Sequence, residues 1–248
     1  MPVALITAGR SRMGQGTAER LLEMGWRVVL ADLDEKGLTQ VQADLGGPSR
    51  VALKRLDFTR LDDVRRVVAE VIAEEGAIDG MVNIGGGRRS LGIPRAYFME
   101  SDPSHWQKMI DANLKAVMNC CHAVIPHMMA RKQGVIVNMS ASKGLRGGPK
   151  TTIYSACKAG IIALGQSLAV ELGPYNIRVN SILPGNTESQ WKPDVNRDNY
   201  DPEPSSKQPL GRRTSAKDVG NMIGWLMSDE ATYITGCALD VSGGSTLH

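Results

Sequence analysis

The sequence predicts an α/β protein: one doubly wound parallel sheet with helices on both faces. Short apolar runs alternate with helical stretches along the whole chain, a pattern typical of parallel strands joined by helical crossovers. The 248 residues are 42% hydrophobic and 22% charged, which is enough for one sizeable core. The sequence has no internal repeat at solenoid periods. We therefore expect a single domain over residues 1–248.

The apolar runs that predict strands lie at 2–7, 27–31, 51–56, 80–82, 135–137, 178–182 and 238–241. The stretches that predict helices lie at about 18–24, from 34 onward, and at 61–73, 102–130, 154–175 and 216–227. The polar, proline-containing stretch 191–208 has no periodicity. Because it lies inside a regular alternation, we expect a substrate lid at about 190–208 rather than a linker.

Charge and cysteine usage exclude several classes of protein. The formal net charge of +3 is small and dispersed, which argues against nucleic-acid binding. Cys120, Cys121, Cys157 and Cys237 lack metal-ligand spacing and lie in apolar contexts, so we expect buried thiols in a reducing compartment. The apolar run at 3–8 is too short for a signal peptide or a membrane span. We therefore expect a cytoplasmic protein with no metal, nucleic-acid or membrane partner.

A glycine-rich turn, Thr7-Ala8-Gly9-Arg10-Ser11-Arg12-Met13-Gly14-Gln15-Gly16, joins the first strand to the first helix. A helix N-terminus at the end of a strand suits a diphosphate group. The G-x-x-x-x-G-K-[ST] phosphate loop is excluded because Gln15 and Gly16 replace its Lys and Ser/Thr, and the strict G-x-G-x-x-G spacing is absent too. These residues alone favour a dinucleotide loop and a ligand-free turn equally.

The second strand ends at Asp32, roughly 20 residues beyond the turn, as dinucleotide-binding units require. A carboxylate there binds both adenosine ribose hydroxyls and repels a 2′-phosphate. The alternative is a helix cap for the segment that begins at Asp34. We favour the ribose role, and therefore NAD over NADP, although Arg10 and Arg12 argue mildly for a 2′-phosphate.

Tyr154 and Lys158 are four residues apart, so on a helix they project from one face. The phenol has a reference pKa of about 10, and a neighbouring cation lowers it by favouring the phenolate. The pair suits acid/base chemistry at an oxygen atom. By itself such a pair is more often a solvated helix face, and a mid-helix residue such as Asn113 is usually a satisfied polar group.

Taken together, these motifs resemble the short-chain dehydrogenase/reductase family, whose fold is of the Rossmann type, over essentially the whole chain. The turn at 7–14 matches the family's dinucleotide loop, and Asp57 matches its adenine-contacting aspartate. The stretch 83–86 matches its N-N-A-G motif, and Tyr154 to Lys158 matches its Y-x-x-x-K motif. Its N-x-x-x-P-G motif falls on 180–185. Further matches lie at Asn113, 209–212 and 233–236.

The resemblance implies roles for these residues. Tyr154 would exchange a proton with the substrate oxygen, Lys158 would lower its pKa and hold the nicotinamide ribose, and Asn113 would position a water in the proton relay. The implied cofactor-binding residues are Gly9, Ser11, Arg12, Met13, Gly14, Asp32, Leu33, Asp57, Phe58, Asn83, Gly85, Tyr154, Lys158, Pro184, Gly185, Thr187 and Ser189.

Three positions depart from the family pattern. Ala8 and Arg12 replace loop glycines, and a guanidinium at position 12 can contact the pyrophosphate. Ala141 replaces the serine that normally hydrogen-bonds the substrate oxygen. Ser140 and Ser142 flank it, and either is a candidate to take over that contact.

We therefore expect an NAD-dependent alcohol dehydrogenase or ketone reductase that forms a homotetramer or dimer, as most of the family does. Two alternatives stay open: an NAD-binding sensor with little turnover, suggested by Ala141 and Arg12, and an NADPH-dependent ketoreductase. Four cations in loops that follow strands suggest an anionic substrate: Arg88, Arg89, Arg146 and Lys150. Trp191 and Tyr200 could supply apolar contacts from the lid.

Overall fold

A computed structural model describes residues 1–187 and 208–246. Seven parallel strands form one sheet in the order β3-β2-β1-β4-β5-β6-β7. The strands are β1 Val3–Thr7, β2 Arg27–Asp32, β3 Val51–Arg55, β4 Gly80–Asn83, β5 Gly134–Met139, β6 Ile177–Pro184 and β7 Ala238–Val241. The strand order reverses between β1 and β4, so the loops after these strands open a crevice at the carboxyl edge. The predicted doubly wound, Rossmann-type fold is confirmed.

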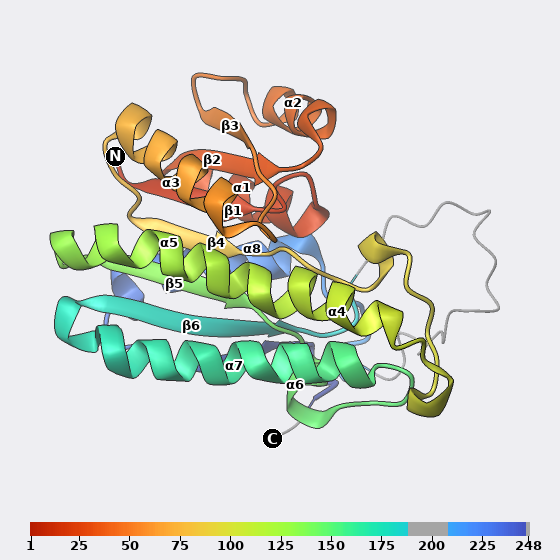
Figure 1. Ribbon diagram of the computed structural model, residues 1–248. Helices are drawn as coiled ribbons and strands as arrows, with labels where there is room; N and C mark the ends of the chain where they lie inside the picture. Colours follow the sequence, from red (N-terminus) through yellow and green to blue (C-terminus); the bar gives the residue numbers. More distant parts are fainter. Residues whose placement is uncertain (188–207, 247–248) are drawn as a thin grey trace.

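Helices cover both faces of the sheet (Figure 1). They are α1 Arg12–Glu23, α2 Glu35–Asp44, α3 Leu61–Glu75, α4 Ser104–Ile110, α5 Ala116–Arg131, α6 Ser142–Arg146, α7 Thr152–Leu172 and α8 Ala216–Met227. On one face, Val67 of α3, Val124 of α5 and Ile161 of α7 pack in one buried cluster. On the other, α1, α2 and α8 bury a second cluster that includes Leu21 and Ile223. These two layers hold the carboxyl edge rigidly.

The long helix expected at 102–130 is interrupted. A π-helical turn, Asp111–Lys115, separates α4 from α5 and carries Asn113. Single π turns inside helices occur frequently at functional sites. A second difference is the short helix α6, which the sequence pattern did not predict. It lies directly between β5 and α7, next to the expected catalytic residues.

Several expectations concern the remaining segments. The predicted lid at about 190–208, with Trp191 and Tyr200, lies outside the described residues apart from Gln208, which is buried. Cys120, Cys121 and Cys157 are buried free thiols, whereas Cys237 is only partly buried. The segment Thr152–Tyr175 is long and apolar enough to cross a membrane by length and composition. In this fold it packs against the sheet, where Ile161, Ala169 and Leu172 are buried.

Candidate active site

A cleft of about 400 Å³ opens at the carboxyl edge of the sheet. Tyr154 and Thr151 border it on one side, and Met13 of α1 borders it on another. Among the predicted residues, the cleft is also lined by Ser140, Ser142, Pro184, Gly185, Thr187 and Arg146. The sheet therefore brings together motifs that are far apart in the sequence, because all of them follow parallel strands. Ser189 lies outside the described residues.

The turn after β1 fits a diphosphate. Ser11 caps α1, and its Oγ accepts a 3.0 Å hydrogen bond from the Gly14 amide. The amides of Arg12 and Met13, in the first turn of α1, have no acceptor among the described residues, as is usual at a helix start. A Cβ on Gly14 would lie 2.6 Å from the Ala8 carbonyl oxygen, so only glycine allows this close approach. These free amides and the helix dipole form an anion site.

Ala8 adopts a left-handed conformation, with φ at 51°. This is the position at which the family pattern has a glycine, and an alanine there carries about 1–2 kcal/mol of steric strain. The turn therefore keeps the glycine-type backbone although its residue has a side chain. The replacement of this loop glycine by Ala8 therefore leaves the path of the chain unchanged but raises its conformational energy.

The end of β2 concentrates acidic groups where the adenosine ribose would lie. Asp32 accepts hydrogen bonds from the amides of Arg10 at 3.3 Å and Asp34 at 3.2 Å. Asp34, not Asp32, is the N-cap of α2, since its Oδ1 accepts from the Gly37 amide. The Arg10 guanidinium pairs with Asp34 at 3.1 Å. Of the two cations considered for a 2′-phosphate, Arg10 is thus already paired with a carboxylate, and the neighbouring Leu33 is half exposed.

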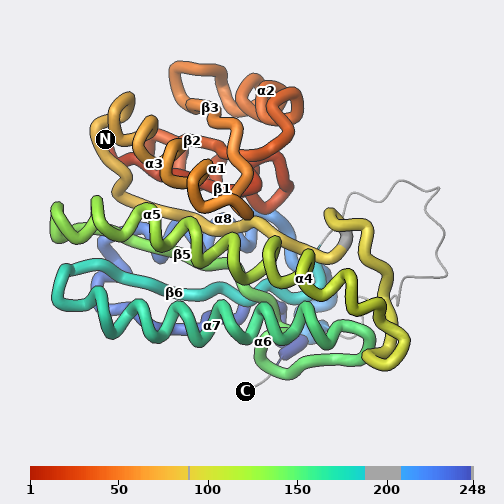
Figure 2. The backbone as a smooth tube through the Cα atoms, in the orientation of Figure 1, coloured from red at the N-terminus to blue at the C-terminus, as the bar shows by residue number. Residues whose placement is uncertain are grey.

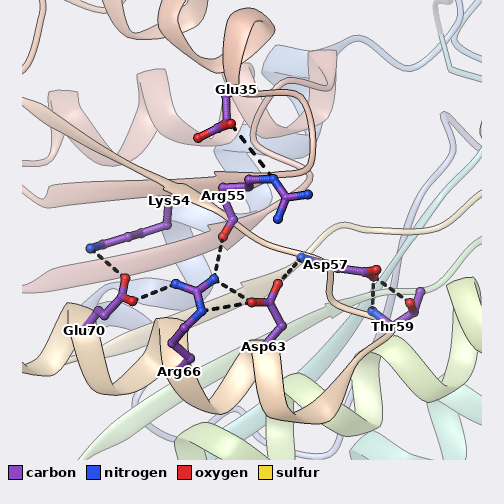
Figure 3. Close-up of polar contacts among 8 residues, drawn as sticks. All are labelled: Glu35, Lys54, Arg55, Asp57, Thr59, Asp63, Arg66 and Glu70. Atoms are coloured by element: carbon purple, nitrogen blue, oxygen red, sulfur yellow. Dashed lines mark hydrogen bonds and ion pairs between the residues drawn. The ribbon is translucent and has the colours of Figure 1, made fainter.

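A charged network fixes the end of β3 and the predicted adenine site (Figure 3). The Asp57 amide donates to Asp63 at 2.7 Å, and Asp63 is bound in turn by the Arg66 guanidinium. Asp57 Oδ1 accepts from the amide and hydroxyl of Thr59. Hydrogen bonds from the Asp57 amide and Arg66 hold the pKa of the partly buried Asp63 below its usual range, although burial opposes them. The network therefore presents Asp57 in a fixed orientation.

The N-N-A-G segment serves the sheet as much as a ligand. Asn83 is buried, and its Nδ2 donates to Asn138 Oδ1 at 2.8 Å, which ties β4 to β5. A Cβ on Gly85 would lie 3.0 Å from the Phe58 ring. Asn83 therefore holds β4 to β5, and Gly85 packs closely against the Phe58 ring.

Tyr154 lies in the first turn of α7 and lines the cleft. No described residue hydrogen-bonds its hydroxyl, so the hydroxyl is available to a substrate. Burial raises the pKa of Tyr154 to about 12, and the Arg88 guanidinium opposes this rise. The sequence predicted a pKa lowered by Lys158. The structure differs because burial dominates, and the cation that lowers this pKa is Arg88.

Lys158 lies one turn further along α7 and is buried. Its Nζ donates to the Met139 carbonyl at 2.9 Å and lies 5.7 Å from the centre of the Tyr154 ring. Burial lowers its pKa to about 8. The helical spacing correctly predicted that the two side chains are neighbours, but the ammonium group lies beside the ring and is held by the end of β5.

Ala141 stands where the family pattern has a serine, and it differs in environment from the flanking Ser140 and Ser142. Ser140 Oγ donates a 2.7 Å hydrogen bond to the Lys158 carbonyl, so its hydroxyl proton is already engaged. Ala141 precedes α6 as its N-cap in an extended conformation. The Ser142 hydroxyl has no partner among the described residues, and Ser142 lines the cleft. Of the two candidates, Ser142 is the one with a free hydroxyl.

Asn113 was expected to position a water molecule, but both ends of its side-chain amide are hydrogen-bonded to other residues of the protein. It is fully buried, and its Oδ1 accepts from the Gly87 amide at 2.7 Å. Its Nδ2 donates to the Met109 carbonyl at 3.0 Å. A Cβ on Gly86 would lie 2.7 Å from Asn113 Oδ1. The side chain therefore fastens the glycine loop after β4 to the π-helical turn; the predicted water relay stays a prediction.

Cations line the cleft. Four line it: Arg88, Arg95, Lys143 and Arg146. None of the described lining residues is acidic. The sequence had pointed to Arg88 and Arg146 but missed Arg95 and Lys143, although Lys143 stands within the Ser-Ala-Ser-Lys-Gly stretch after β5. Lys150 instead borders a neighbouring cavity.

The fold and this site define a class of protein: an oxidoreductase that binds a nicotinamide dinucleotide at the crevice of a doubly wound sheet. A diphosphate turn follows β1, an acidic group ends β2, and an available phenol stands at the edge where the remaining strands end.

Comparisons with known proteins agree. The family model described as enoyl-(acyl carrier protein) reductase matches residues 7–246. A 3-oxoacyl-[acyl-carrier-protein] reductase of Chlamydia muridarum is 35% identical over 97% of this chain and 96% of its own. A cis-4-hydroxycyclohexanecarboxylate dehydrogenase of Sinomonas cyclohexanicum is 32% identical, with 98% and 96% covered. The crystal structure of a 3-ketoacyl-(acyl-carrier-protein) reductase from Brucella melitensis, complexed with NADH, has a TM-score of 0.89 at 27% identity, with 99% and 98% covered. The chain belongs to the short-chain dehydrogenase/reductase family.

Proposed function

We propose that this chain is an NAD(H)-dependent dehydrogenase or reductase that interconverts a secondary alcohol and a ketone, and that its substrate carries an anionic group. The observation that carries the proposal is the unpartnered Tyr154 hydroxyl in a cleft lined by four cations and by no described carboxylate. The phenol exchanges a proton with the reacting oxygen of the substrate. The cations bind an anionic group elsewhere on the same substrate.

The preference for NAD rests on the end of β2. A 2′-phosphate on the adenosine ribose would lie beside Asp32 and Asp34, and the Arg10 guanidinium is already paired with Asp34. Coulomb repulsion from two carboxylates opposes the phosphate, while ribose hydroxyls can donate to Asp32.

The residues divide the chemistry as follows. A bound nicotinamide supplies the hydride donor or acceptor. Tyr154 gives its proton to the developing alkoxide during reduction and takes it back during oxidation. Ser142 donates a hydrogen bond to the same oxygen, which stabilises the developing charge. Lys158 and Ser140 hold the end of β5 against α7, so Tyr154 and Ser142 keep their relative positions.

The anionic part of the substrate would bind Arg88 and its neighbours. The Sinomonas relative is named for a substrate that carries a hydroxyl and a carboxylate, which supports a hydroxy acid as the class. The reductase names of other relatives support the ketone-reducing direction.

One observation favours a second function, a dinucleotide-binding sensor with little turnover. The family's substrate-binding serine is replaced by Ala141, and burial holds the pKa of Tyr154 at about 12, far from neutral. Such a site would bind the cofactor tightly while its acid/base group worked poorly.

The test is NADH binding by fluorescence, followed by NAD reduction with secondary alcohols and hydroxy acids. Turnover that prefers hydroxy acids, is lost in Tyr154→Phe and leaves NADH binding intact supports the dehydrogenase. Tight binding without turnover on the whole panel favours the sensor, and Ala141→Ser then tests whether the serine restores activity. A clear preference for NADPH contradicts the NAD assignment.

A further inference from the structure

A second cavity, of about 130 Å³, lies on the other side of Tyr154 from the cofactor cleft. Arg88, Thr151 and Tyr154 line both spaces. We call this second cavity the side chamber; its apolar walls are Ile93, Phe98, Trp106, Met109, Ile153 and Tyr154. In Figure 2 the chain after β4 runs past the start of α4 toward the loop between α6 and α7, and this passage builds the chamber.

The chamber has a hydrophobic floor. Ile93, Met109 and Cys157 are buried together, and the side chains of Ile153 and Tyr154 pack against them. These residues come from the loop after β4, from α4 and from α7. The floor therefore sits directly behind the phenol ring whose hydroxyl serves the reacting oxygen.

Two aromatic rings form the opposite wall. The rings of Phe98 and Trp106 stack with centroids 5.2 Å apart and planes inclined by 17°. The Trp106 indole N–H donates to Ser101 Oγ at 3.1 Å, so its polar atom is already satisfied by another residue that lines the chamber. What the indole presents inward is thus apolar surface.

Charged side chains also line the chamber. They include Glu100, Asp102, His105 and Lys150, and the Lys150 ammonium lies 4.9 Å from the centre of the Tyr97 ring. Arg88, Thr151 and Tyr154 line both the chamber and the cleft, so an occupant that enters from the cleft passes these three side chains before it reaches the apolar walls.

The size of the chamber defines what fits. An apolar cavity of about 150 Å³ lined by Leu, Ile and Phe stays dry and binds benzene. At about 130 Å³ the side chamber matches one ring or a short branched alkyl group in size. Its apolar walls favour such a group over water, although charged residues also line it.

We propose that the side chamber binds an apolar arm of the substrate, either a six-membered ring or an alkyl group of about four to six carbons. The inference rests on the proposed function: the carbon that bears the reacting oxygen lies at Tyr154, the anionic group faces Arg88 in the cleft, and the apolar arm enters the chamber. The substrate class is then a hydroxy or keto acid with a compact hydrophobic substituent.

The test is calorimetric titration of the full chain, with and without saturating NADH, using acetate, butanoate, hexanoate, cyclohexanecarboxylate and phenylacetate. We expect affinity to rise about fourfold per added methylene until the chamber is full. Ile93→Trp fills the chamber, so it abolishes this rise but leaves acetate binding unchanged. Met99→Trp introduces the same side chain at a residue that is 92% exposed and serves as the matched control, with the rise retained.

An affinity that is equal across the carboxylates overturns the inference, and so does a rise that survives in Ile93→Trp. If Ile93→Trp fails to fold by circular dichroism, Phe98→Ala replaces it: a widened chamber must shift the preference toward larger acids, and an unchanged preference overturns the inference. Chain-length dependence without any NAD turnover supports the chamber and contradicts the proposed function. Turnover without chain-length dependence supports the proposed function and contradicts the chamber.

Discussion

The hydroxyl of Ser140 donates a 2.7 Å hydrogen bond to the backbone carbonyl of Lys158, and this contact joins the end of β5 to helix α7, which carries Tyr154. The two segments also approach closely at Gly144, where a Cβ would lie 2.8 Å from the Lys158 carbonyl carbon. Ser140 is thus engaged in positioning α7, which leaves Ser142 as the serine with a free hydroxyl. This hydrogen bond therefore distinguishes Ser140 from Ser142, whereas the sequence left both as candidates for the contact with the substrate oxygen.

The first prediction follows for the two serines. Ser142→Ala should lower kcat/KM by about 100-fold, because it removes a donor to the developing alkoxide. Ser140→Ala should mainly lower the free energy of unfolding, by about 0.5–1.5 kcal/mol, since it removes a buried hydrogen bond between the end of β5 and α7. Steady-state kinetics and urea unfolding of both variants check this. The reverse pattern, with turnover lost in Ser140→Ala alone, would assign the contact to Ser140.

Arg88 should control the pH dependence of alcohol oxidation. Its guanidinium lowers the pKa of Tyr154 against the rise that burial causes, and oxidation needs the deprotonated phenol, so Arg88→Ala should move the rising limb of the kcat/KM profile to higher pH. Arg88→Lys keeps the positive charge, so it should return this limb most of the way to its position in the wild type. Arg146→Ala is the matched control: it removes a cleft cation that does not act on Tyr154, so it should weaken anionic substrates without moving the limb. An unmoved limb in Arg88→Ala contradicts the assignment.

Lys158 should make stability rise with pH in an alkaline window. Burial lowers its pKa to about 8, whereas in the unfolded chain the pKa is near 10.5. Between these values the unfolded state binds more protons, so the free energy of unfolding rises with pH; below pH 8 both states are charged and the full penalty remains.

Lys158→Met removes that penalty. We expect the variant to be more stable than the wild type at pH 7, by on the order of 2 kcal/mol, with a gap that narrows from about pH 8 upward. Urea unfolding between pH 7 and about 10, where tyrosine begins to titrate, measures it. Lys150→Met, at an exposed site, should show no such dependence. If the difference in free energy of unfolding between Lys158→Met and the wild type is constant with pH, Lys158 is not a buried cation.

Asp32 should determine the choice of cofactor. Asp32→Ala removes charge-assisted hydrogen bonds to the ribose, so NADH affinity should fall about 10- to 100-fold while NADPH affinity stays equal or rises. Asp34→Asn keeps the cap of α2 but removes the second carboxylate and the partner of Arg10, so it should raise NADPH affinity while NADH affinity is retained. Equal loss of both cofactors in Asp32→Ala would indicate a structural role, because Asp32 also binds the Arg10 and Asp34 amides.

Ala8→Gly should stabilise the protein. The residue has a φ of 51°, and relief of that strain outweighs the added freedom of glycine in the unfolded chain by up to about 1 kcal/mol. The urea midpoint should therefore rise with an unchanged slope. Ala18→Gly, at a buried helical position, should show the opposite sign. A destabilised Ala8→Gly would contradict the strain argument.

Local patterns predicted much of the fold and part of the site. Periodicity placed the strands, and because parallel strands end at one edge, it also placed the loops that follow them. The helical spacing made Tyr154 and Lys158 neighbours. By contrast, the π-helical turn was not predictable, because it accompanies contacts of Asn113 with Gly87, a residue of a distant loop. Arg95 was missed because nothing in its neighbourhood shows that it returns to the cleft.

The sequence by itself determined the order of elements, the glycine-rich turn, the acidic end of β2 and the Tyr154–Lys158 pair. These depend on residues that are close along the chain. Only the tertiary structure decided that Lys158 binds the Met139 carbonyl, that Arg88 acts on Tyr154 and that a side chamber lies behind the phenol. Burial and charge contacts set these properties, and both depend on which distant segments the packed core brings together.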